Sequence, residues 1–374
     1  MFYLICLLLT GSLCAGDGDA FFTGNAQFAD RLPMSPTGSE LYSPYNLANA
    51  MGMVYFGAKG ETAEQIKQVF SFPGSAEQTV YALGTIQKKW EPLDSLQVAN
   101  GLFVEKTFSL LPTFRQPLEK TLQAHLQELD FIHDPAGAAS HINQWVNEKT
   151  EGKIDNLVTR DTIDPMMRLI VVSTLWFKSP WLHPFDPAKT AKAPFYLVDG
   201  ATKEVEMMEQ VEALSYYEEN GATAVALPFQ NGAELWLILP KEKEWSWETF
   251  LSVKQTAERR QIHLFLPKFT LEKAYEMSAL LKRLGMPLPF SPSADLSGMA
   301  QNRNLHTSAV IHKTFFTLDE NGAEAAAATA IGIRTTSLID PRTQLTLRFD
   351  HPFLFALVDR TTGGILFIGS WMGP

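Results

Sequence analysis

The side chains best suited to chemistry are scattered along this chain of 374 residues. Its eight histidines show no H-E-x-x-H spacing, which would place two zinc ligands on one helix face. The segment GAKGET at 57–62 lacks the Lys-Ser/Thr pair with which a phosphate loop grips phosphate and metal. No G-x-S-x-G nucleophile elbow and no G-x-G-x-x-G turn occurs. We therefore predict no enzyme activity, no metal and no cofactor; a hydrolase triad built from distant residues stays the alternative, because geometry defines it.

One stretch, DENGAEAAAATAIGIRTTSLIDPRTQL from Asp319 to Leu345, has an unusual composition. Six alanines fall within residues 323–330, and alanine has the highest helix propensity, so propensity alone favours a helix. A strand fits the same residues, because alternate positions of a strand share one face and here they are small or apolar. That face would carry Ala323, Ala325, Ala327, Thr329, Ile331 and Ile333. The local pattern leaves helix and strand both open.

Composition indicates a folded protein that does not bind nucleic acid. Hydrophobic residues make up 45% of the chain and aromatic residues 11%, which is enough for a sizeable core. Acidic residues number 41 against 31 basic ones, and the net charge of −10 argues against a polyanionic partner. No repeat, low-complexity tract or Gly/Ser linker divides the sequence. We therefore predict one domain.

The N-terminus has the features of a cleavable export signal. An apolar run from Phe2 to Leu9 is followed by small residues and then by the acidic Asp17. The run is too short to span a bilayer, so no membrane span is expected. We predict a signal peptide at 1–16, a mature domain at 17–374 and an extracellular, secreted product. A basic start is missing, and the alternative is an uncleaved apolar N-terminus on an intracellular protein.

Both cysteines, Cys6 and Cys14, lie in this leader. A processed chain would therefore contain no disulfide, no metal thiolate and no cysteine nucleophile. Its stability must come from packing.

Periodic patterns predict helices mainly in the first half of the chain and strands mainly in the second. The helical pattern covers 47–56, 61–70, 112–128, 138–150 and 275–284, and in the last segment Ser278 could start the helix and Gly285 could end it. The strand-like runs cover 169–177, 223–229, 234–240, 261–269, 310–318, 353–358 and 365–371, the last two joined by a turn at 359–364. Strands do not alternate regularly with helices, so we predict a mixed α+β architecture rather than a doubly wound parallel sheet.

Many ordered segments resemble the serpin family of serine protease inhibitors, from about Asn25 to the C-terminus. LYSPYNLANAMGMVYFGAKGETAEQI at 41–66 is similar to the early serpin segment that begins at a Ser-Pro pair. The later segments, in the family's order, are VANGLFVEKTFSLLPTF, INQWVNEKTEGKIDNLV, LWFKSPWLHPFDPAKTAKAPFY, LPKF, LLKRLGM, ADLSGM, VIHKTFFTLDENGAEAAAATA, HPFLFALVD and GGILFIG. So many ordered matches do not arise by chance.

Three positions depart from the family pattern. Asn46 stands where a serine is usual, Ser173 where an asparagine is common, and Ala323 where threonine is frequent. The resemblance places the first two beneath the main sheet, so opening of that sheet is expected to be tuned differently here. Ala323 is small and apolar, which suits burial.

Resemblance to serpins implies the serpin fold: three β-sheets, about eight or nine helices, and an exposed reactive-centre loop at about 320–345. This loop offers a bait peptide bond to a protease and, once cut, enters the main sheet as an extra strand. The resemblance therefore favours the strand over the helix for the alanine-rich stretch. It also implies a serine-type endopeptidase inhibitor that acts once, as a suicide substrate.

The hinge at the start of the loop favours an inhibitor, because small side chains pass most easily between packed strands. Gly322 allows the backbone to turn without a side-chain clash. The small residues of this hinge are Ala323, Ala325, Ala326, Ala327 and Ala328. The alternative is a non-inhibitory serpin that acts as a carrier or chaperone.

Further residues take expected roles from the resemblance alone. Glu320 resembles the acidic hinge residue and Lys268 its basic partner near the top of the sheet, while Trp181 resembles a tryptophan packed there. His312 resembles the histidine that forms hydrogen bonds beneath the central strands, close to Ser43 and Asn46.

The resemblance implies a scissile bond at Thr336-Ser337, the position reached by counting from Glu320 at the hinge length that is usual in serpins. The bonds after Arg334, Leu338 and Arg342 remain alternatives. The residue before the bond enters the primary pocket of the protease: threonine suits a small pocket, arginine an acidic one and leucine an apolar one. We therefore expect an elastase-like serine protease as partner, with trypsin-, chymotrypsin- and subtilisin-like enzymes as alternatives, and a monomeric inhibitor.

Overall fold

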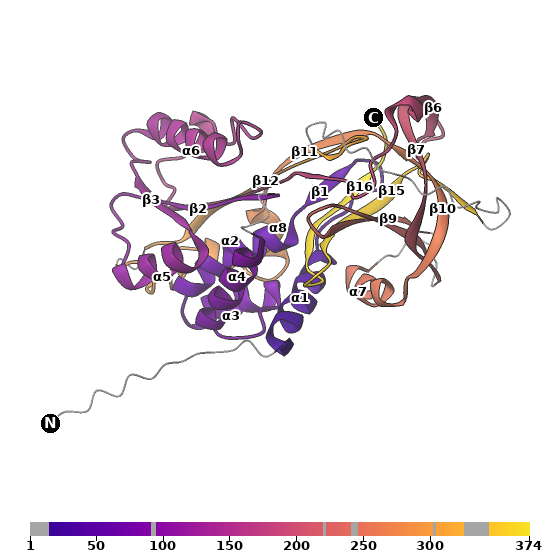
Figure 1. Cartoon of the computed structure of the whole chain (residues 1–374). Coiled ribbons are helices and arrows are strands. Elements are labelled where there is room, and N and C mark those ends of the chain that lie inside the picture. The colour runs from indigo at the N-terminus through magenta and orange to yellow at the C-terminus, as the bar shows by residue number, and fades with distance from the viewer. Residues whose placement is uncertain (1–14, 91–94, 220–221, 241–245, 302–303, 325–343) are drawn as a thin grey trace.

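The computed structural model describes residues 15–90, 95–219, 222–240, 246–301, 304–324 and 344–374 (Figure 1). Within these ranges the chain forms eight α-helices, six of them in its first half. They are α1 (Ala15–Ala29), α2 (Pro44–Gly57), α3 (Gly60–Phe70), α4 (Ala76–Trp90), α5 (Pro112–Leu122), α6 (Pro135–Lys149), α7 (Trp247–Thr256) and α8 (Ser278–Arg283). None of the described helices is long and apolar enough to cross a membrane.

A five-stranded sheet lies at the centre of the molecule. Its strands, in spatial order, are β11 (Phe269–Glu276), β12 (Thr307–Leu318), β4 (Leu169–Phe177), β2 (Leu96–Glu105) and β3 (His125–Leu129). β12 and β4 are parallel and pair directly, from Thr307 opposite Leu169 to Phe315 opposite Trp176. All nine residues of β4 are buried, as expected for a strand covered on both faces.

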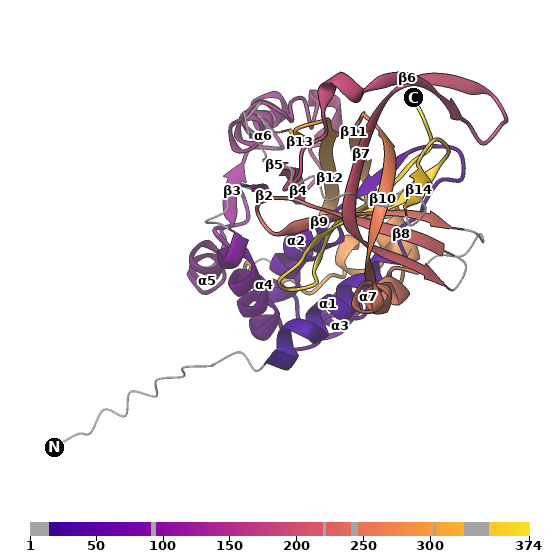
Figure 2. The same ribbon diagram turned by 45° about the vertical axis from the view of Figure 1, so that its right-hand side comes forward.

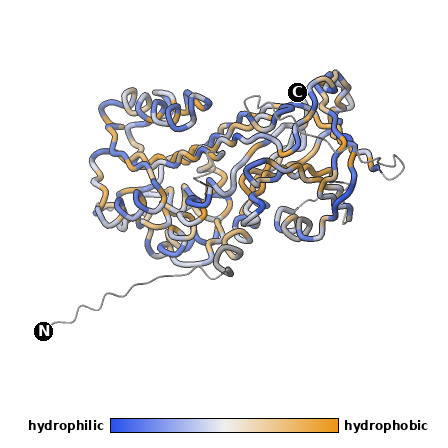
Figure 3. The backbone as a smooth tube through the Cα atoms, in the orientation of Figure 1, coloured by the Kyte–Doolittle hydropathy of each residue, from blue (hydrophilic) through white to orange (hydrophobic). Residues whose placement is uncertain are grey.

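The two faces of this sheet pack on different cores. Helix α6 lies over one face, where Ile142 and Val146 pack with Ile170 and Val172 of β4. The opposite face belongs to the main core and carries the alternate residues Val171 and Leu175. Figure 3 shows apolar residues along the strands of the interior.

The second sheet has nine strands, and segments far apart in the sequence meet in it. In spatial order it contains β1 (Glu40–Tyr42), β16 (Ile365–Trp371), β15 (Phe353–Asp359), β9 (Ala233–Pro240), β8 (Ala222–Pro228), β7 (Thr202–Glu219), β10 (Glu258–Pro267) and β14 (Leu345–Arg348), with β6 (Ala191–Tyr196) also paired to β7. β15 and β16 form an antiparallel hairpin, and this hairpin lies between β1 and β9. The hairpin predicted at the end of the sequence is therefore present.

The third sheet is a short pair, β13 (Gly322–Ala323) with β5 (Ser179–Pro180). Together the three sheets and eight described helices confirm the predicted α+β fold class. Figure 2 shows β13 and β5 near α6 and the end of β12.

Helix α2 fixes the centre of the molecule because it is buried along its whole length. Ser43 caps its N-terminus, where the hydroxyl accepts a hydrogen bond from the Asn46 backbone N–H, and Pro44 occupies the first turn. The helix packs against β4 and β16, and thus joins the two large sheets.

The helix expected over 112–128 has a wrong end. It stops at Leu122, because Gln123 takes a left-handed conformation (φ +50°), and residues 125–129 form β3, which pairs with β2. Strand pairing there overrides a helical apolar spacing. Within the helical pattern over 275–284, the helix begins at Ser278 as predicted and ends at Arg283, just before Gly285 (φ +117°), while residues 275 and 276 continue β11 in its ladder with β12.

Candidate functional site

The hinge begins with a tight turn that leads out of β12. The Asp319 backbone N–H donates to the carbonyl oxygen of Gly322 at 3.0 Å, and the Asp319 carboxylate accepts from the backbone N–H groups of Asn321 and Gly322. Gly322 and Ala323 then pair with Pro180 and Ser179. The turn therefore brings the hinge back against β5.

Gly322 is required here by conformation and by space. Its φ of +145° lies in the region that side chains disfavour. A Cβ atom at this position would lie 2.2 Å from the carbonyl oxygen of Ser179 and 2.8 Å from the backbone N of Trp181. Any larger residue would push the hinge off β5.

Glu320 forms a buried ion pair at this turn. Its carboxylate lies 3.2 Å from Nζ of Lys268 and accepts a hydrogen bond from the Thr190 hydroxyl at 2.7 Å. Lys268 also contacts Glu206 at 3.1 Å. Burial alone would raise the pKa of Glu320, but the hydrogen bond from Thr190 and the charge of Lys268 outweigh it and lower the pKa. The carboxylate is therefore charged at neutral pH.

The pKa of Lys268 shifts in the opposite direction. Burial alone would lower its pKa, and the hydrogen bonds and charges of Glu206 and Glu320 raise the pKa above the usual value instead. The two expected partners thus meet as a charged pair, with the Glu320 side chain 9% exposed and the Lys268 side chain 31% exposed.

Trp181 holds the same turn from the side of β5. Its indole N–H donates to the carbonyl oxygen of Asp319 at 3.0 Å, and its backbone N–H donates to that of Asn321 at 2.8 Å. The indole stacks on Phe229, with ring centroids 4.2 Å apart. Trp181 therefore binds the backbone of the two residues that flank Glu320.

Ala323 and Glu324 point to opposite faces. Ala323 is fully buried in the main core, while the Glu324 carboxylate contacts Trp176 and Lys153. Ala323 thus faces inward as the sequence predicts, but the strand ends there, because Glu324 has a left-handed φ of +45°. Ala325, Ala326, Ala327, Ala328, Thr336 and Ser337 lie outside the described residues, as do Arg334, Leu338 and Arg342.

A second cluster of predicted residues lies beneath the central strands. The Ser43 backbone N–H donates to Nε2 of His312 at 3.0 Å, and the Ser43 hydroxyl donates to the carbonyl oxygen of Leu366 at 2.6 Å. Nδ1 of His312 lies 3.1 Å from the carbonyl oxygen of Ser173. These contacts join α2, β4, β12 and β16 through side chains that are fully buried.

The hydrogen bonds fix the protonation of His312. A backbone N–H can only donate, so Nε2 is the acceptor and Nδ1 carries the proton. Burial lowers the pKa of His312 to about 3, although the hydrogen bond to Ser173 opposes the change. The imidazole is therefore neutral at physiological pH and acts as a structural link, not as an acid or base.

Asn46 and Ser173, the two positions that depart from the family pattern, contact each other. Nδ2 of Asn46 donates to Oγ of Ser173 at 2.9 Å, and Oδ1 of Asn46 accepts from Nδ2 of Asn100 at 2.8 Å. The usual serine and asparagine have thus exchanged places across one hydrogen bond.

Four residues of the site were missed by sequence reasoning: Thr190, Asn100, Trp176 and Lys153. The first two complete the contacts of Glu320 and Asn46, and the last two contact Glu324. All four lie within the serpin-like segments quoted from the sequence, but nothing in those segments marks them individually. In the part of the chain that is described, no three His, Cys, Asp or Glu residues are grouped to hold a metal ion.

The fold and the hinge define an α+β protein of serpin type, and comparisons with known proteins agree. The model of the serpin (serine protease inhibitor) family matches residues 26–374. The chain is 35% identical over 360 residues to leukocyte elastase inhibitor A of Mus musculus, covering 91% of this chain and 94% of that protein. This chain belongs to the serpin family.

Solved serpin structures superpose on most of the chain. Serpin48, described as a highly specific serpin of the insect Tenebrio molitor, gives a TM-score of 0.81 at 28% identity and covers 96% of this chain and 98% of its own. The structure of human thyroxine-binding globulin in complex with its hormone gives a TM-score of 0.84 at 25% identity, and the superposition covers 96% of this chain and 98% of that one.

Proposed function

We propose that this protein inhibits a serine endopeptidase as a suicide substrate. One observation carries the proposal: β4 and β12 pair directly, and the hinge stands at the end of that pair with its first inward side chain, Ala323, already in the core. A strand that continues from Ala323 would find the odd-numbered small residues on the same inward face.

The proposed reaction starts like ordinary peptide hydrolysis. The hydroxyl oxygen of the protease serine attacks the carbonyl carbon of Thr336, and the bond from that carbon to the nitrogen of Ser337 breaks. The serine proton passes to the departing amine of Ser337, and Thr336 stays bound to the protease as an ester. Cleavage frees the hinge side of the loop to enter the sheet before water hydrolyses the ester.

In this proposal, entry of the loop is favourable because the inserted segment gains strand partners on both sides. An inserted strand would pair with both β4 and β12, in place of the contact that these strands make with each other. Each hydrogen bond adds roughly 0.5–1.5 kcal/mol net, and burial of the alanine methyl groups adds to this. The attached protease would be carried along and its active site distorted.

The target is proposed to be elastase-like. A threonine before the scissile bond suits a small primary pocket. The name of the Mus musculus relative, leukocyte elastase inhibitor A, supports the same choice. Cleavage after Arg334, Leu338 or Arg342 would instead select a trypsin-like or chymotrypsin-like enzyme.

The test is incubation of the purified protein with elastase-, trypsin-, chymotrypsin- and subtilisin-like proteases. A covalent complex that survives denaturing electrophoresis, with the cut mapped to 336–337 by mass spectrometry, is the expected result. Cleavage of the loop without a trapped complex for every enzyme would overturn the proposed inhibition.

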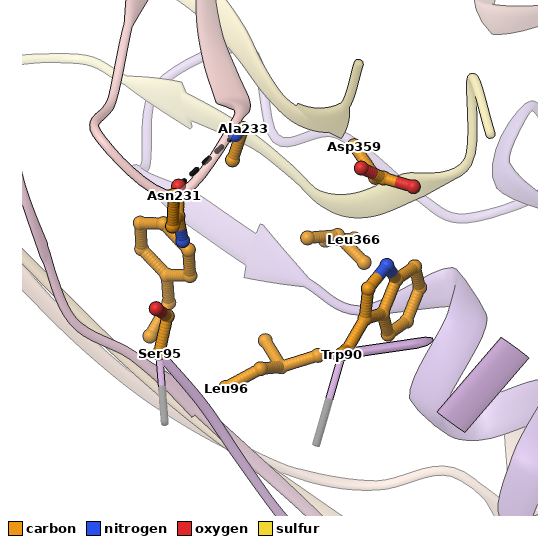
Figure 4. A pocket seen from close by; sticks show the side chains of 8 residues that line it. Trp90, Ser95, Leu96, Asn231, Ala233, Asp359 and Leu366 are labelled. Atoms are coloured by element: carbon orange, nitrogen blue, oxygen red, sulfur yellow. Dashed lines mark hydrogen bonds between the residues drawn. The ribbon is translucent and has the colours of Figure 1, made fainter. Parts of the chain in front are cut away.

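The second candidate is a carrier, which the similarity to thyroxine-binding globulin suggests. One small cavity is lined by Trp90, Leu96, Ala233, Asp359 and Leu366, among others (Figure 4). Its volume is about 20 Å³, room for about one water molecule, whereas small-molecule sites occupy several hundred Å³. This cavity is too small for a hormone, but a wider hollow of about 620 Å³, lined by Leu197, Thr270 and Trp371 among others, has the size of a small-molecule site. A hormone panel assayed by calorimetry before and after loop cleavage tests the carrier.

We also propose export of the protein, with removal of residues 1–16. The family match begins at residue 26, beyond this leader. Helix α1 begins at Ala15, so cleavage after Gly16 would remove only its first two residues. Expression in a secreting host followed by N-terminal sequencing tests this: a product in the medium that begins at Asp17 is expected, and a retained chain with an intact leader contradicts it.

A further inference from the structure

The side chain of Glu324 is held by groups from two other parts of the chain. Its carboxylate accepts a hydrogen bond from the indole Nε1 of Trp176 and forms an ion pair with Nζ of Lys153. The ammonium group of Lys178 lies 5.0 Å from the centroid of the Trp176 ring. The Glu324 side chain is 18% exposed, so the carboxylate is largely withdrawn from water in a site of positive charge.

The backbone of Glu324 is in a conformation that a strand cannot use. Its φ is +45°, in the left-handed region that non-glycine residues seldom adopt, whereas β-strands require a strongly negative φ. Such a conformation persists where surrounding contacts impose it. For the chain to continue from Ala323 as a strand, Glu324 must rotate its backbone and give up its present contacts.

Trp176 marks the point where the central sheet must open. It is opposite Phe315 in the last pair of the β4–β12 ladder. Alternation along β4 puts Trp176 on the same face as Val172, which packs with α6. A strand that enters between β4 and β12 from the hinge has to separate this pair first.

Lys153 belongs to the segment that follows α6, and this segment is tied to the same face of the sheet. The carbonyl oxygen of Asp155 accepts a hydrogen bond from Nζ of Lys313 in β12 at 3.0 Å. Glu151 pairs with Lys178, which follows β4, at 3.1 Å. The segment that carries Lys153 is therefore bonded to β12 through Lys313 and to Lys178, the residue that follows β4.

We propose that Lys153 and Trp176 act through Glu324 as a restraint that holds the hinge out of the five-stranded sheet until the loop is cut. The proposal rests on the loop insertion proposed above. The three residues are positioning residues: they set how readily the hinge enters the sheet and take no part in attack on the scissile bond.

The experiment follows spontaneous insertion of the uncut loop. Wild type, Glu324→Gln, Lys153→Met and the double variant are held at one temperature, chosen so that the wild type converts measurably, and the heat-resistant form is quantified with time. Lys192→Met is the matched control, because it removes an exposed ion pair with Glu204, 2.7 Å long, on β6 and β7. The rate of loop cutting by a protease is measured in parallel.

We expect each single variant to convert about two- to fivefold faster, which is the scale of one partly exposed ion pair. The double variant should be no faster than the faster single variant, because both changes remove the same contact. Loop cutting and the control should match the wild type. Unchanged conversion rates, additive effects, or a wild type that unfolds without converting would overturn the restraint.

Failure of the restraint is distinguished from failure of the proposed function by one further measurement on the wild type. Its melting temperature is compared before and after loop cleavage. A large rise in melting temperature, together with variant conversion rates equal to that of the wild type, means that the cut loop inserts but that the proposed restraint is wrong. No rise means that the cut loop does not insert, and both proposals fall.

Discussion

Asn46 and Ser173 share one buried hydrogen bond, 2.9 Å long, and they are the two positions at which this chain departs from its family beneath the central strands. We expect each departure to compensate for the other. The amide donates from α2 and the hydroxyl accepts from β4, so the link between helix and sheet survives the exchange of residue types.

This pairing predicts strong coupling between the two sites. Asn46→Ser should lose the hydrogen bond and leave Asn100 without its acceptor, at a cost of about 1–2 kcal/mol. Ser173→Asn should crowd the same buried space, at a cost of about 1–3 kcal/mol. The double exchange should recover most of both losses, as measured by urea unfolding. Simple addition of the two losses would show that the residues act independently.

Gly322→Ala should displace the hinge from β5. The new Cβ would lie 2.2 Å from the carbonyl oxygen of Ser179, so we expect a loss of about 1–3 kcal/mol and a lower melting temperature. Gly200→Ala is the control: its φ of +84° is also left-handed, but nothing lies within 4 Å of the place that the new methyl group would occupy. Equal losses at the two positions would mean that backbone strain alone matters at the hinge.

His312 should make the folded protein sensitive to acid. Burial lowers its pKa to about 3 in the folded state, while an unfolded histidine titrates near 6.5, so the unfolded chain binds the proton first as the pH falls. As the pH falls from about 6.5 to about 3, protonation of this group alone should lower the free energy of unfolding by about 1.4 kcal/mol per pH unit.

The measurement compares denaturant unfolding of the wild type and His312→Gln from pH 7 to pH 4. The variant should be less stable at pH 7, because it loses buried hydrogen bonds, but it should lack this part of the pH slope. His351→Gln, at a position whose side chain is 52% exposed, should keep the wild-type slope. If the free energy of unfolding changed with pH equally in the wild type and in His312→Gln, the lowered pKa of His312 would be contradicted.

Ala325→Arg should abolish the trapped protease complex and leave the loop cleavable. Ala323 is buried in the main core, and residue 325 follows on the same face of a continuing strand, so insertion would bury an unpaired charge. Ala325→Val is the matched control, because a small uncharged side chain can be buried at the same position and should keep most of the trapping. Electrophoresis of protease mixtures measures both; full trapping by Ala325→Arg would refute the inward-facing assignment.

Local patterns in the sequence predicted many elements but not their ends. The run 169–177 coincides with β4, because a fully buried strand is continuously apolar. At 125–129 the prediction was wrong: five residues are too few for a period to distinguish strand from helix, and pairing with β2 decided the outcome. β7, with 18 residues, was not predicted as a strand because polar and charged residues interrupt it.

The residues of the candidate site were predicted from resemblance to the serpin family, but the contacts among them are seen only in the folded structure. Glu320 and Lys268 are 52 positions apart in the sequence, and Asn46 and Ser173 are 127 apart. No local spacing encodes such contacts. The contacts of Trp176 and Lys153 with Glu324 were missed for the same reason, although the inward position of Ala323 was predicted from the sequence.

The position of the β15–β16 hairpin has a consequence for synthesis on the ribosome. β1 and β9 are made first, yet neither can pair with the hairpin until residues 353–371 have left the exit tunnel. Each growing chain therefore carries two unpaired strand edges for most of its translation, and such edges favour association with neighbouring chains. The nine-stranded sheet can be completed only after this hairpin has been translated. The yield of active protein therefore depends on how well the nascent chain is protected from association with other chains during that interval.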